Sequence, residues 1–197
     1  MSAKKDGLAH IGGWIALNDD VLAEKLEQQI FITEGFKTYG GLAGRDLDMI
    51  ATGLAEVVEF NYLKHRFYLN EDLARKLSNL GVPVLKPVIG HAIFVDAEAF
   101  LPGICAAKFP AQALSIALYV EGGIRSCEIG SLSYGGQAPC ELVRLAMPRR
   151  VYTEDQLNHV VEAFKKIIPK KDKLCGFRIV RAPAVLRQFT AVIEFLD

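Results

Sequence analysis

The sequence has 197 residues, of which 51% are hydrophobic and 23% are charged, so a sizeable core can form and an intrinsically disordered chain is excluded. Basic and acidic residues number 23 each, and neither half of the chain carries a basic block. This balance argues against nucleic acid or an anionic membrane as a partner. The length fits one large domain or two small ones.

The four cysteines are widely spaced and form no CxxC pair: Cys105, Cys127, Cys140 and Cys175. Such spacing is typical of reduced cytosolic thiols, and not of a disulfide framework or a zinc site. The N-terminus has no apolar signal core, and no apolar run approaches about 18 residues. We therefore expect a soluble, cytoplasmic protein.

The first elements predicted along the chain are a short buried strand at residues 11–18 and an amphipathic helix at residues 19–30. Asp19 or Asp20 is expected to cap the free amides of that helix. A glycine-rich loop follows at residues 31–46, and a helical pattern then runs over residues 45–80, with a possible break near residues 59–66. A lone strand cannot bury both of its faces. We infer that a partner chain completes this region, or that the chain is part of something longer.

The second half of the sequence alternates strands with helices, which indicates a small α/β domain. The clearest helix is "TEDQLNHVVEAFKKI", in which Thr153 and Gln156 have the spacing of a capping box. A second helix is predicted over residues 109–123, ended by two glycines. The predicted strands lie at residues 91–97, 124–131, 140–148, 176–180 and 188–196.

Seven segments occur together in one order: "SAKKD", "IGGWIALND", "EGFKTYGGLAGRD", "GHAIFVDAEAFLP", "FPAQALSIALYVEGGIRSCEIGS", "LVRLAMPRRVYT" and "VLRQFTA". In order and approximate spacing they resemble the tryptophanase and tyrosine phenol-lyase family, β-eliminating lyases that use pyridoxal phosphate. The resemblance covers the whole chain but only the C-terminal portion of a family member. It implies the end of a fold-type I large domain at residues 1–45, a connecting helix at 46–80 and a C-terminal small α/β domain at 81–197.

Within this resemblance, Lys5 matches the lysine that forms the covalent link to the cofactor aldehyde. From composition alone, a lysine pair at the start of a chain is a solvated tip. A nucleophilic amine must be neutral, and a neighbouring cation and a dry pocket both favour that form. Ser2 matches the serine that hydrogen-bonds the cofactor phosphate, and Lys4 adds positive charge there. Tyr39 matches a tyrosine that reaches the cofactor site of a neighbouring subunit; alternatively, its ring packs locally in its loop.

Arg144 stands in an otherwise apolar predicted strand, and the resemblance implies that it binds the α-carboxylate of the substrate. A planar guanidinium matches a carboxylate with two parallel hydrogen bonds. The alternative is an arginine that reaches a surface carboxylate. His10 matches a position whose main-chain carbonyl joins a monovalent cation (K⁺) site in the family. His91 is interpreted as structural.

Two positions bear on the leaving group. Tyrosine phenol-lyases have an arginine where this chain has Ile129, and the apolar side chain of Ile129 suits indole better than a phenol oxygen. The tryptophanase pattern has histidine where this chain has Gln188, which can hydrogen-bond but cannot shuttle a proton near neutral pH. In the glycine-rich loop, Lys37 replaces the proline that is usual in the family.

The resemblance therefore implies a tryptophanase-like lyase that converts L-tryptophan to indole, pyruvate and ammonia with pyridoxal 5'-phosphate, as a homotetramer. The alternatives are a tyrosine phenol-lyase-like or S-alkyl-cysteine lyase. Several of the family's cofactor-binding groups lie N-terminal to the matched lysine. This leaves open a non-catalytic fragment with an interaction or oligomerisation role, or an enzyme completed by a separately encoded N-terminal half.

Overall fold

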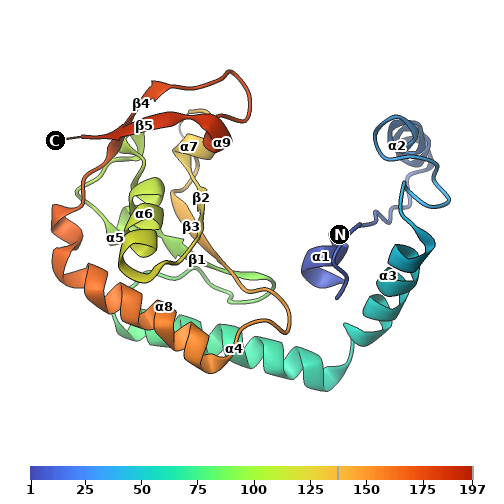
Figure 1. Ribbon diagram of the computed structural model, residues 1–197, viewed down its shortest axis with the longest axis horizontal. Coiled ribbons are helices and arrows are strands. Elements are labelled where there is room, and N and C mark those ends of the chain that lie inside the picture. The colour runs from blue at the N-terminus through green and yellow to red at the C-terminus, as the bar shows by residue number, and fades with distance from the viewer. Residues whose placement is uncertain (137, 197) are drawn as a thin grey trace. The chain divides into compact units, whose positions relative to one another are not determined.

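The computed structural model describes residues 1–136 and 138–196, and Figure 1 shows the order of their helices and strands. The chain divides into two compact units, Met1–Arg66 and Phe67–Asp197. The predicted domain boundaries at residues 45 and 80 stay a prediction.

The first unit is helical. It contains α1 (Ala3–Asp6), α2 (Asp20–Thr33), α3 (Gly44–Glu56) and the first residues of α4 (Phe60–Asn79). The predicted helix and its cap are confirmed, because the Asp19 side chain accepts a hydrogen bond of 2.9 Å from the amide of Leu22. The predicted break in the following helix exists but lies at residues 57–59, at the start of the predicted segment 59–66, since α3 ends at Glu56 and α4 begins at Phe60.

The buried strand predicted at residues 11–18 is wrong. An isolated bridge joins Ser2 to Gly13, and the apolar side chains that follow stay on the surface, with Trp14 44% and Ile15 65% exposed. A strand needs a hydrogen-bonded neighbour along its length. The described residues 1–66 form no sheet that this segment could join.

The second unit is a mixed α/β domain with two antiparallel sheets. β1 (Ala92–Asp96), β3 (Leu142–Ala146) and β2 (Cys127–Ile129) form one sheet in the order β1-β3-β2, and β4 (Phe177–Arg181) pairs with β5 (Val192–Phe195) in the other. Four of the five strands lie within the predicted segments, and β4 extends one residue beyond its segment, to Arg181. The prediction at residues 188–196 is wrong in its first half, because α9 (Arg187–Thr190) precedes β5 there.

Two long helices build the core of this unit on one face of the three-stranded sheet (Figure 1). α6 (Pro110–Gly122) packs against α8 (Glu154–Ile167) and against β3. Phe164 of α8 is fully buried, and its ring meets Phe100 edge-on with centroids 5.8 Å apart. The predicted capping box of α8 is confirmed, since Thr153 and Gln156 exchange backbone-to-side-chain hydrogen bonds.

The remaining elements are short helices: α5 (Ala97–Phe100), α7 (Ser131–Tyr134) and the 3₁₀ turns Ala106–Lys108 and Ile168–Lys173. In the described part of the chain, none of the helices combines the length and the apolarity that crossing a bilayer requires. The four cysteines are free and exposed.

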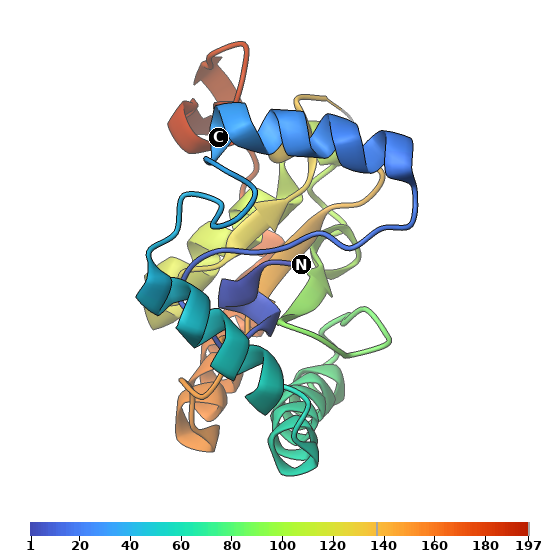
Figure 2. The same ribbon diagram turned by 90° about the vertical axis from the view of Figure 1, so that its right-hand side faces the viewer.

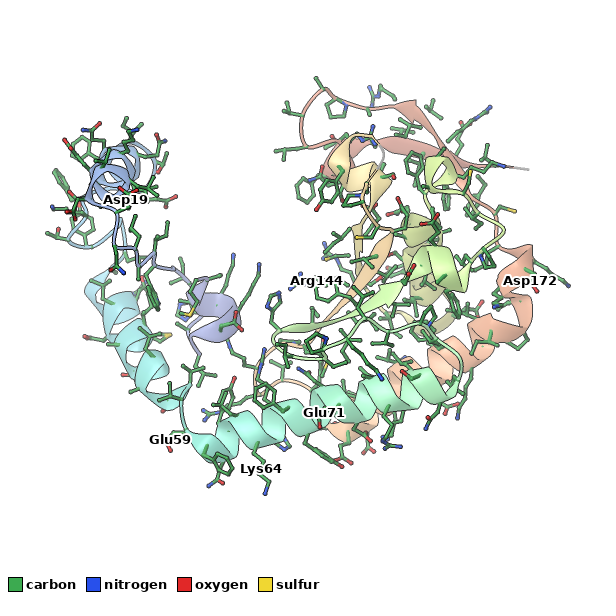
Figure 3. The ribbon with its side chains drawn as sticks, turned by 180° about the vertical axis from the view of Figure 1, so that it is seen from behind. Asp19, Glu59, Lys64, Glu71, Arg144 and Asp172 are labelled. Atoms are coloured by element: carbon green, nitrogen blue, oxygen red, sulfur yellow. The ribbon has the colours of Figure 1, made fainter. Side chains whose placement is uncertain are left out.

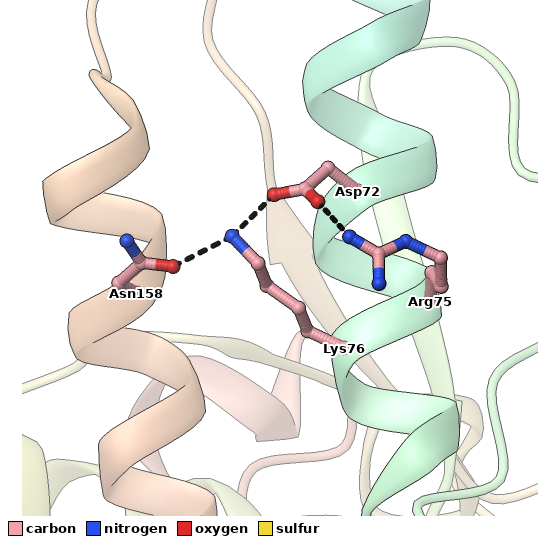
Figure 4. A network of polar contacts seen from close by, with 4 residues as sticks. All are labelled: Asp72, Arg75, Lys76 and Asn158. Atoms are coloured by element: carbon pink, nitrogen blue, oxygen red, sulfur yellow. Dashed lines mark hydrogen bonds and ion pairs between the residues drawn. The ribbon is translucent and has the colours of Figure 1, made fainter.

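A polar network joins α4 to α8 within the second unit (Figure 4). The Lys76 ammonium lies 2.5 Å from the carboxylate of Asp72 and donates a 2.8 Å hydrogen bond to Asn158 on α8. Arg75 binds the other carboxylate oxygen of Asp72. Burial opposes ionisation of Asp72, but the hydrogen bonds and charges of Lys76 and Arg75 outweigh it and hold the pKa of Asp72 below its ordinary value.

Replacing Asp72 by asparagine is expected to lower the free energy of unfolding by about 1–3 kcal/mol at neutral pH, because charge-assisted hydrogen bonds to a buried carboxylate are lost. A lowered folded-state pKa stabilises the fold above the unfolded value of about 3.9, and this stabilisation is lost as the pH falls through the folded pKa. The gap between wild type and variant should therefore close in acid.

Urea unfolding followed by circular dichroism at several pH values measures this gap. Lys165→Gln is the matched control, because Lys165 pairs with Glu162 on the surface of α8 and both side chains are at least half exposed. Its effect should stay within about 0.5 kcal/mol. A gap for Asp72→Asn that is the same at neutral and acid pH would contradict the assignment of this carboxylate as the ionised partner.

Candidate functional site

The short helix α1 presents Lys4 and Lys5 on the surface of the first unit. Ser2 occupies its N-cap position, where the backbone carbonyl accepts the amide of Lys5 at 3.1 Å while the side-chain hydroxyl makes no capping hydrogen bond. This hydroxyl and the two ammonium groups therefore come from one four-residue segment. A hydroxyl and a charged ammonium suit a phosphate, and a lysine amine in its neutral form suits an aldehyde.

Close backbone packing fixes the position of α1. A Cβ at Gly53 would lie 2.1 Å from the carbonyl oxygen of Gly7, so the absence of a side chain lets α3 lie directly against the end of α1. The amide of Ala3 donates to Gly12 at 3.0 Å, and Arg66 lies 3.8 Å from the carboxylate of Asp6. The segment that bears Lys5 is thus held on several sides.

Tyr39 lies in the loop between α2 and α3 and is exposed. Its ring packs beside Phe36, with centroids 6.0 Å apart, which is the local packing that the alternative interpretation describes. The loop needs glycine at residue 41, where φ is +73° and a Cβ would lie 2.1 Å from the carbonyl oxygen of Glu34. Lys37 forms a 2.9 Å ion pair with Glu27 of α2, so it ties the loop to that helix.

His10 is an exposed residue whose imidazole Nε2 lies 3.7 Å from Asp46 at the start of α3. The cation role concerns its main-chain carbonyl and stays a prediction. Among residues 1–136 and 138–196, no cluster of three or more His, Cys, Asp or Glu side chains is placed to hold a metal ion.

In the second unit, Arg144 and Ile129 lie on the same face of the three-stranded sheet. Arg144 on the central strand β3 is opposite Phe94 of β1 and Cys127 of β2, and Ile129 is opposite Leu142 two residues away. Since side chains alternate along a strand, these residues share the face opposite to that of the buried core. Figure 3 shows Arg144 within this sheet. The structure brings these two predicted residues together.

The guanidinium of Arg144 is partly buried. Its Nε atom is shielded from solvent and has no hydrogen-bond partner among the described residues. An unpaired buried donor costs about 1–3 kcal/mol, a cost that an acceptor on a bound anion would remove. The Nε donor of Arg144 is therefore available to a ligand.

Gln188, the third residue predicted in this unit, is half-buried in α9, which packs against α7. The residue before it, Arg187, donates from Nε to the carbonyl of Leu132 at 2.7 Å and from Nη2 to the carbonyl of Ser131. α7 begins two residues after Ile129. The segments that carry Ile129 and Gln188 are therefore joined by one guanidinium.

Two acids beside α7, one fully buried and one half-buried, were missed at the sequence level. The fully buried Glu141 accepts the amide of Ser131 at 2.7 Å, and Glu128 accepts the amides of Leu132 and Ser133 at 3.2 and 3.1 Å. Burial, together with the charge of Glu141, raises the pKa of Glu128. An acid within each of the two apolar strand patterns, "CEIGS" and "CELVRLA", is the sequence signal that could have identified them.

Comparisons with known proteins give this geometry its context. Residues 1–163 match the family described as beta-eliminating lyase. The chain is 53% identical to the tryptophanase of Hyphomonas neptunium, with all of this chain and 45% of that protein covered. It is 52% identical to the tryptophanase of Salinibacter ruber over 97% of this chain and 42% of that protein.

A tyrosine phenol-lyase, that of Symbiobacterium thermophilum, is 44% identical over 98% of this chain and 44% of the relative. The chain thus spans less than half the length of the curated relatives that it matches, and it corresponds to their C-terminal part. The resemblance found in the sequence is confirmed: this chain belongs to the beta-eliminating lyase family.

Proposed function

We propose that this chain is the C-terminal part of a pyridoxal-phosphate-dependent carbon–carbon lyase that cleaves L-tryptophan to indole, pyruvate and ammonia. The observation that carries the proposal is the 53% identity to a tryptophanase over the whole chain. The two curated tryptophanases named above are 52–53% identical, whereas the tyrosine phenol-lyase is 44% identical, which favours indole over phenol as the leaving group.

The residues of α1 fit the cofactor. When bound, pyridoxal phosphate supplies an aldehyde carbon and a ring that accepts the electron pair released at the substrate Cα. Lys5 would hold the aldehyde through its exposed amine, and the hydroxyl of Ser2, which is not used for capping, would donate to the phosphate. Lys4 adds positive charge to the same segment. Tyr39 and a potassium ion at the carbonyl of His10 complete the proposed large-domain end of the site, which corresponds to residues 1–45.

In the proposed reaction, Lys5 and three residues of the second unit each act on a different group of the substrate. The amine of Lys5 takes the proton from the substrate Cα. The guanidinium of Arg144 binds the α-carboxylate with two parallel hydrogen bonds and so fixes the orientation of the bonds at Cα. Ile129 provides apolar contact for the indole ring, and Gln188 accepts a hydrogen bond from a ring N–H. Because glutamine does not titrate, it orients the leaving group without moving a proton.

Exposed apolar side chains around α2 in the first unit favour binding of a partner protein segment. α2 has no buried residue, and it runs apart from α1 and α3 of the same unit, as Figure 1 and Figure 2 both show. Trp14, Ile15 and Phe31 are 44–65% exposed. A groove of about 950 Å³ lies beside α2 and includes Trp14 and Tyr39 in its lining. Exposed apolar side chains that line one groove are typical of an interaction site.

We propose that the N-terminal part of a beta-eliminating lyase covers this apolar surface. This chain covers 45% of the Hyphomonas neptunium tryptophanase, so more than half of that relative is available to form such a part. Homotetramer formation would follow from that complete large domain. The competing hypothesis, a non-catalytic interaction fragment, uses the same surface and differs in predicting no turnover.

The test is a pyruvate assay with pyridoxal phosphate and tryptophan, tyrosine or S-methylcysteine. It is run on the chain alone and on the complemented protein, which is the chain plus the separately produced N-terminal part of the Hyphomonas neptunium tryptophanase. We expect pyruvate from tryptophan in the complemented protein at well above the rate seen with tyrosine. Complex formation without pyruvate from any amino acid would favour the interaction fragment, and a tyrosine preference would reverse the assignment of the substrate.

A further inference from the structure

Glu128, Glu141 and Arg187 hold α7 from both sides. The two carboxylates accept the first three amides of this helix, at Ser131, Leu132 and Ser133, while Arg187 donates to the carbonyls of Ser131 and Leu132. The free amides of a helix start favour negative charge, and its free carbonyls favour positive charge. The negative carboxylates therefore face backbone amides, and the positive guanidinium faces backbone carbonyls.

Gly130 is the connection between this arrangement and Ile129. A Cβ at residue 130 would lie 2.4 Å from Oε2 of Glu141 and 2.8 Å from Oε1 of Glu128, so only glycine passes between the two carboxylates. Ile129 immediately precedes this glycine, at the last position of β2. A shift of either carboxylate would move the backbone that carries Ile129.

Arg187 makes the corresponding connection to Gln188. It is the first residue of α9, and its guanidinium spans from that helix to α7, 55 residues earlier in the chain. Two hydrogen bonds from one planar group fix both distance and orientation. The positions of Ile129 and Gln188 are thus set against each other by α7.

We propose that Glu128, Glu141 and Arg187 form a positioning unit that sets the spacing of Ile129 and Gln188 and so determines which leaving groups the site accepts. This inference rests on the proposed lyase function. The three residues do not touch the reacting atoms; they act through the two residues that face the leaving group. A substrate whose leaving group is too small to reach both residues should not depend on this unit.

The test compares kcat/KM for tryptophan and for S-methylcysteine in the complemented protein. Arg187→Met and Gly130→Ala are expected to lower the value for tryptophan about 10- to 100-fold, as misplacement of groups by about 1 Å does. The value for S-methylcysteine should change less than about twofold. Arg187→Lys keeps the charge but only one donor direction, and should recover part of the tryptophan rate.

The matched controls are Arg178→Met, which removes an exposed guanidinium paired with Glu194 on β4 and β5, and Gly136→Ala, where a Cβ meets nothing within 4 Å. Both should leave the substrate ratio unchanged. Hydrogen exchange of the amides of residues 131–133 should accelerate in Arg187→Met and in Gly130→Ala.

The outcomes distinguish a failure of the positioning role from a failure of the lyase function. Equal losses on both substrates, or an unchanged ratio in Arg187→Met, would overturn the positioning role while the lyase function stands. A complemented wild type that forms pyruvate from neither amino acid would overturn the lyase function and this inference with it. Amide exchange that is unaffected in every variant would show that the contacts do not hold α7.

Discussion

Replacing Lys5 by alanine is expected to abolish the covalent attachment of pyridoxal phosphate, and with it the visible absorbance of the lysine-bound cofactor. The reason is chemical: only a primary amine can form this link, and α1 presents the amine of Lys5 on the surface, three residues after Ser2. In the complemented protein the same variant should form no pyruvate, since the amine proposed to take the Cα proton is removed.

Selectivity is the decisive measurement, because any exposed lysine reacts slowly with an aldehyde. After incubation with pyridoxal phosphate, reduction with borohydride and peptide mapping show which amines carry the label. Lys4→Ala is the matched control: it removes the neighbouring cation from the same helix and leaves Lys5 in place. We expect labelled Lys5 in that variant. Label that is spread evenly over the surface lysines, or an absorbance that Lys5→Ala leaves intact, would remove Lys5 from the proposed role.

The sequence predicted best those elements whose signals are local. The capping box at Thr153 and the 3.6-residue period after it identify α8, and an apolar run bounded by polar residues identifies β1 and β3. Residues 11–18 have the same apolar character as β1, but β1 has β3 to pair with and residues 11–18 have no strand beside them in the described chain. Pairing is a non-local property that composition does not carry.

The residues of the candidate site also divide into those that local motifs identify and those that only non-local contacts identify. Lys5, Arg144 and Ile129 were found because they lie inside motifs that resemble a family, and Arg144 is also conspicuous as a charge in an apolar strand. Arg187 and Glu141 were not found, because their importance comes from backbone groups of α7 that lie 55 and 10 residues away in sequence. A residue that binds main chain leaves no complementary side chain for pattern reasoning to detect.

Replacing Arg144 is expected to have opposite effects on stability and on substrate binding. In Arg144→Met, a side chain of similar length removes a buried Nε that has no partner among the described residues, so the free energy of unfolding should stay the same or rise. Loss of a charge-assisted, two-pronged hydrogen bond to a carboxylate should meanwhile weaken substrate binding by about 1.5–3 kcal/mol, which is roughly a 10- to 150-fold rise in the tryptophan concentration required.

Two analogues show whether the carboxylate is the group that Arg144 recognises. Indole-3-propionate has the carboxylate and the ring but no amine, and tryptamine has the amine and the ring but no carboxylate. As inhibitors of the complemented protein, indole-3-propionate should lose most of its affinity in Arg144→Met, whereas tryptamine should be unaffected. Arg144→Lys should fall between wild type and Arg144→Met, because an ammonium keeps the charge but lacks the planar fork.

Arg181→Met is the matched control for this series, since Arg181 is an exposed arginine at the end of β4. It should change neither the unfolding free energy nor the inhibition by either analogue by more than a small factor. If tryptamine and indole-3-propionate weaken equally in Arg144→Met, the arginine supports the sheet and does not bind the substrate carboxylate. If the variant instead loses stability, the buried guanidinium has a structural partner, and the case for a ligand at Nε fails because the donor was never unpaired.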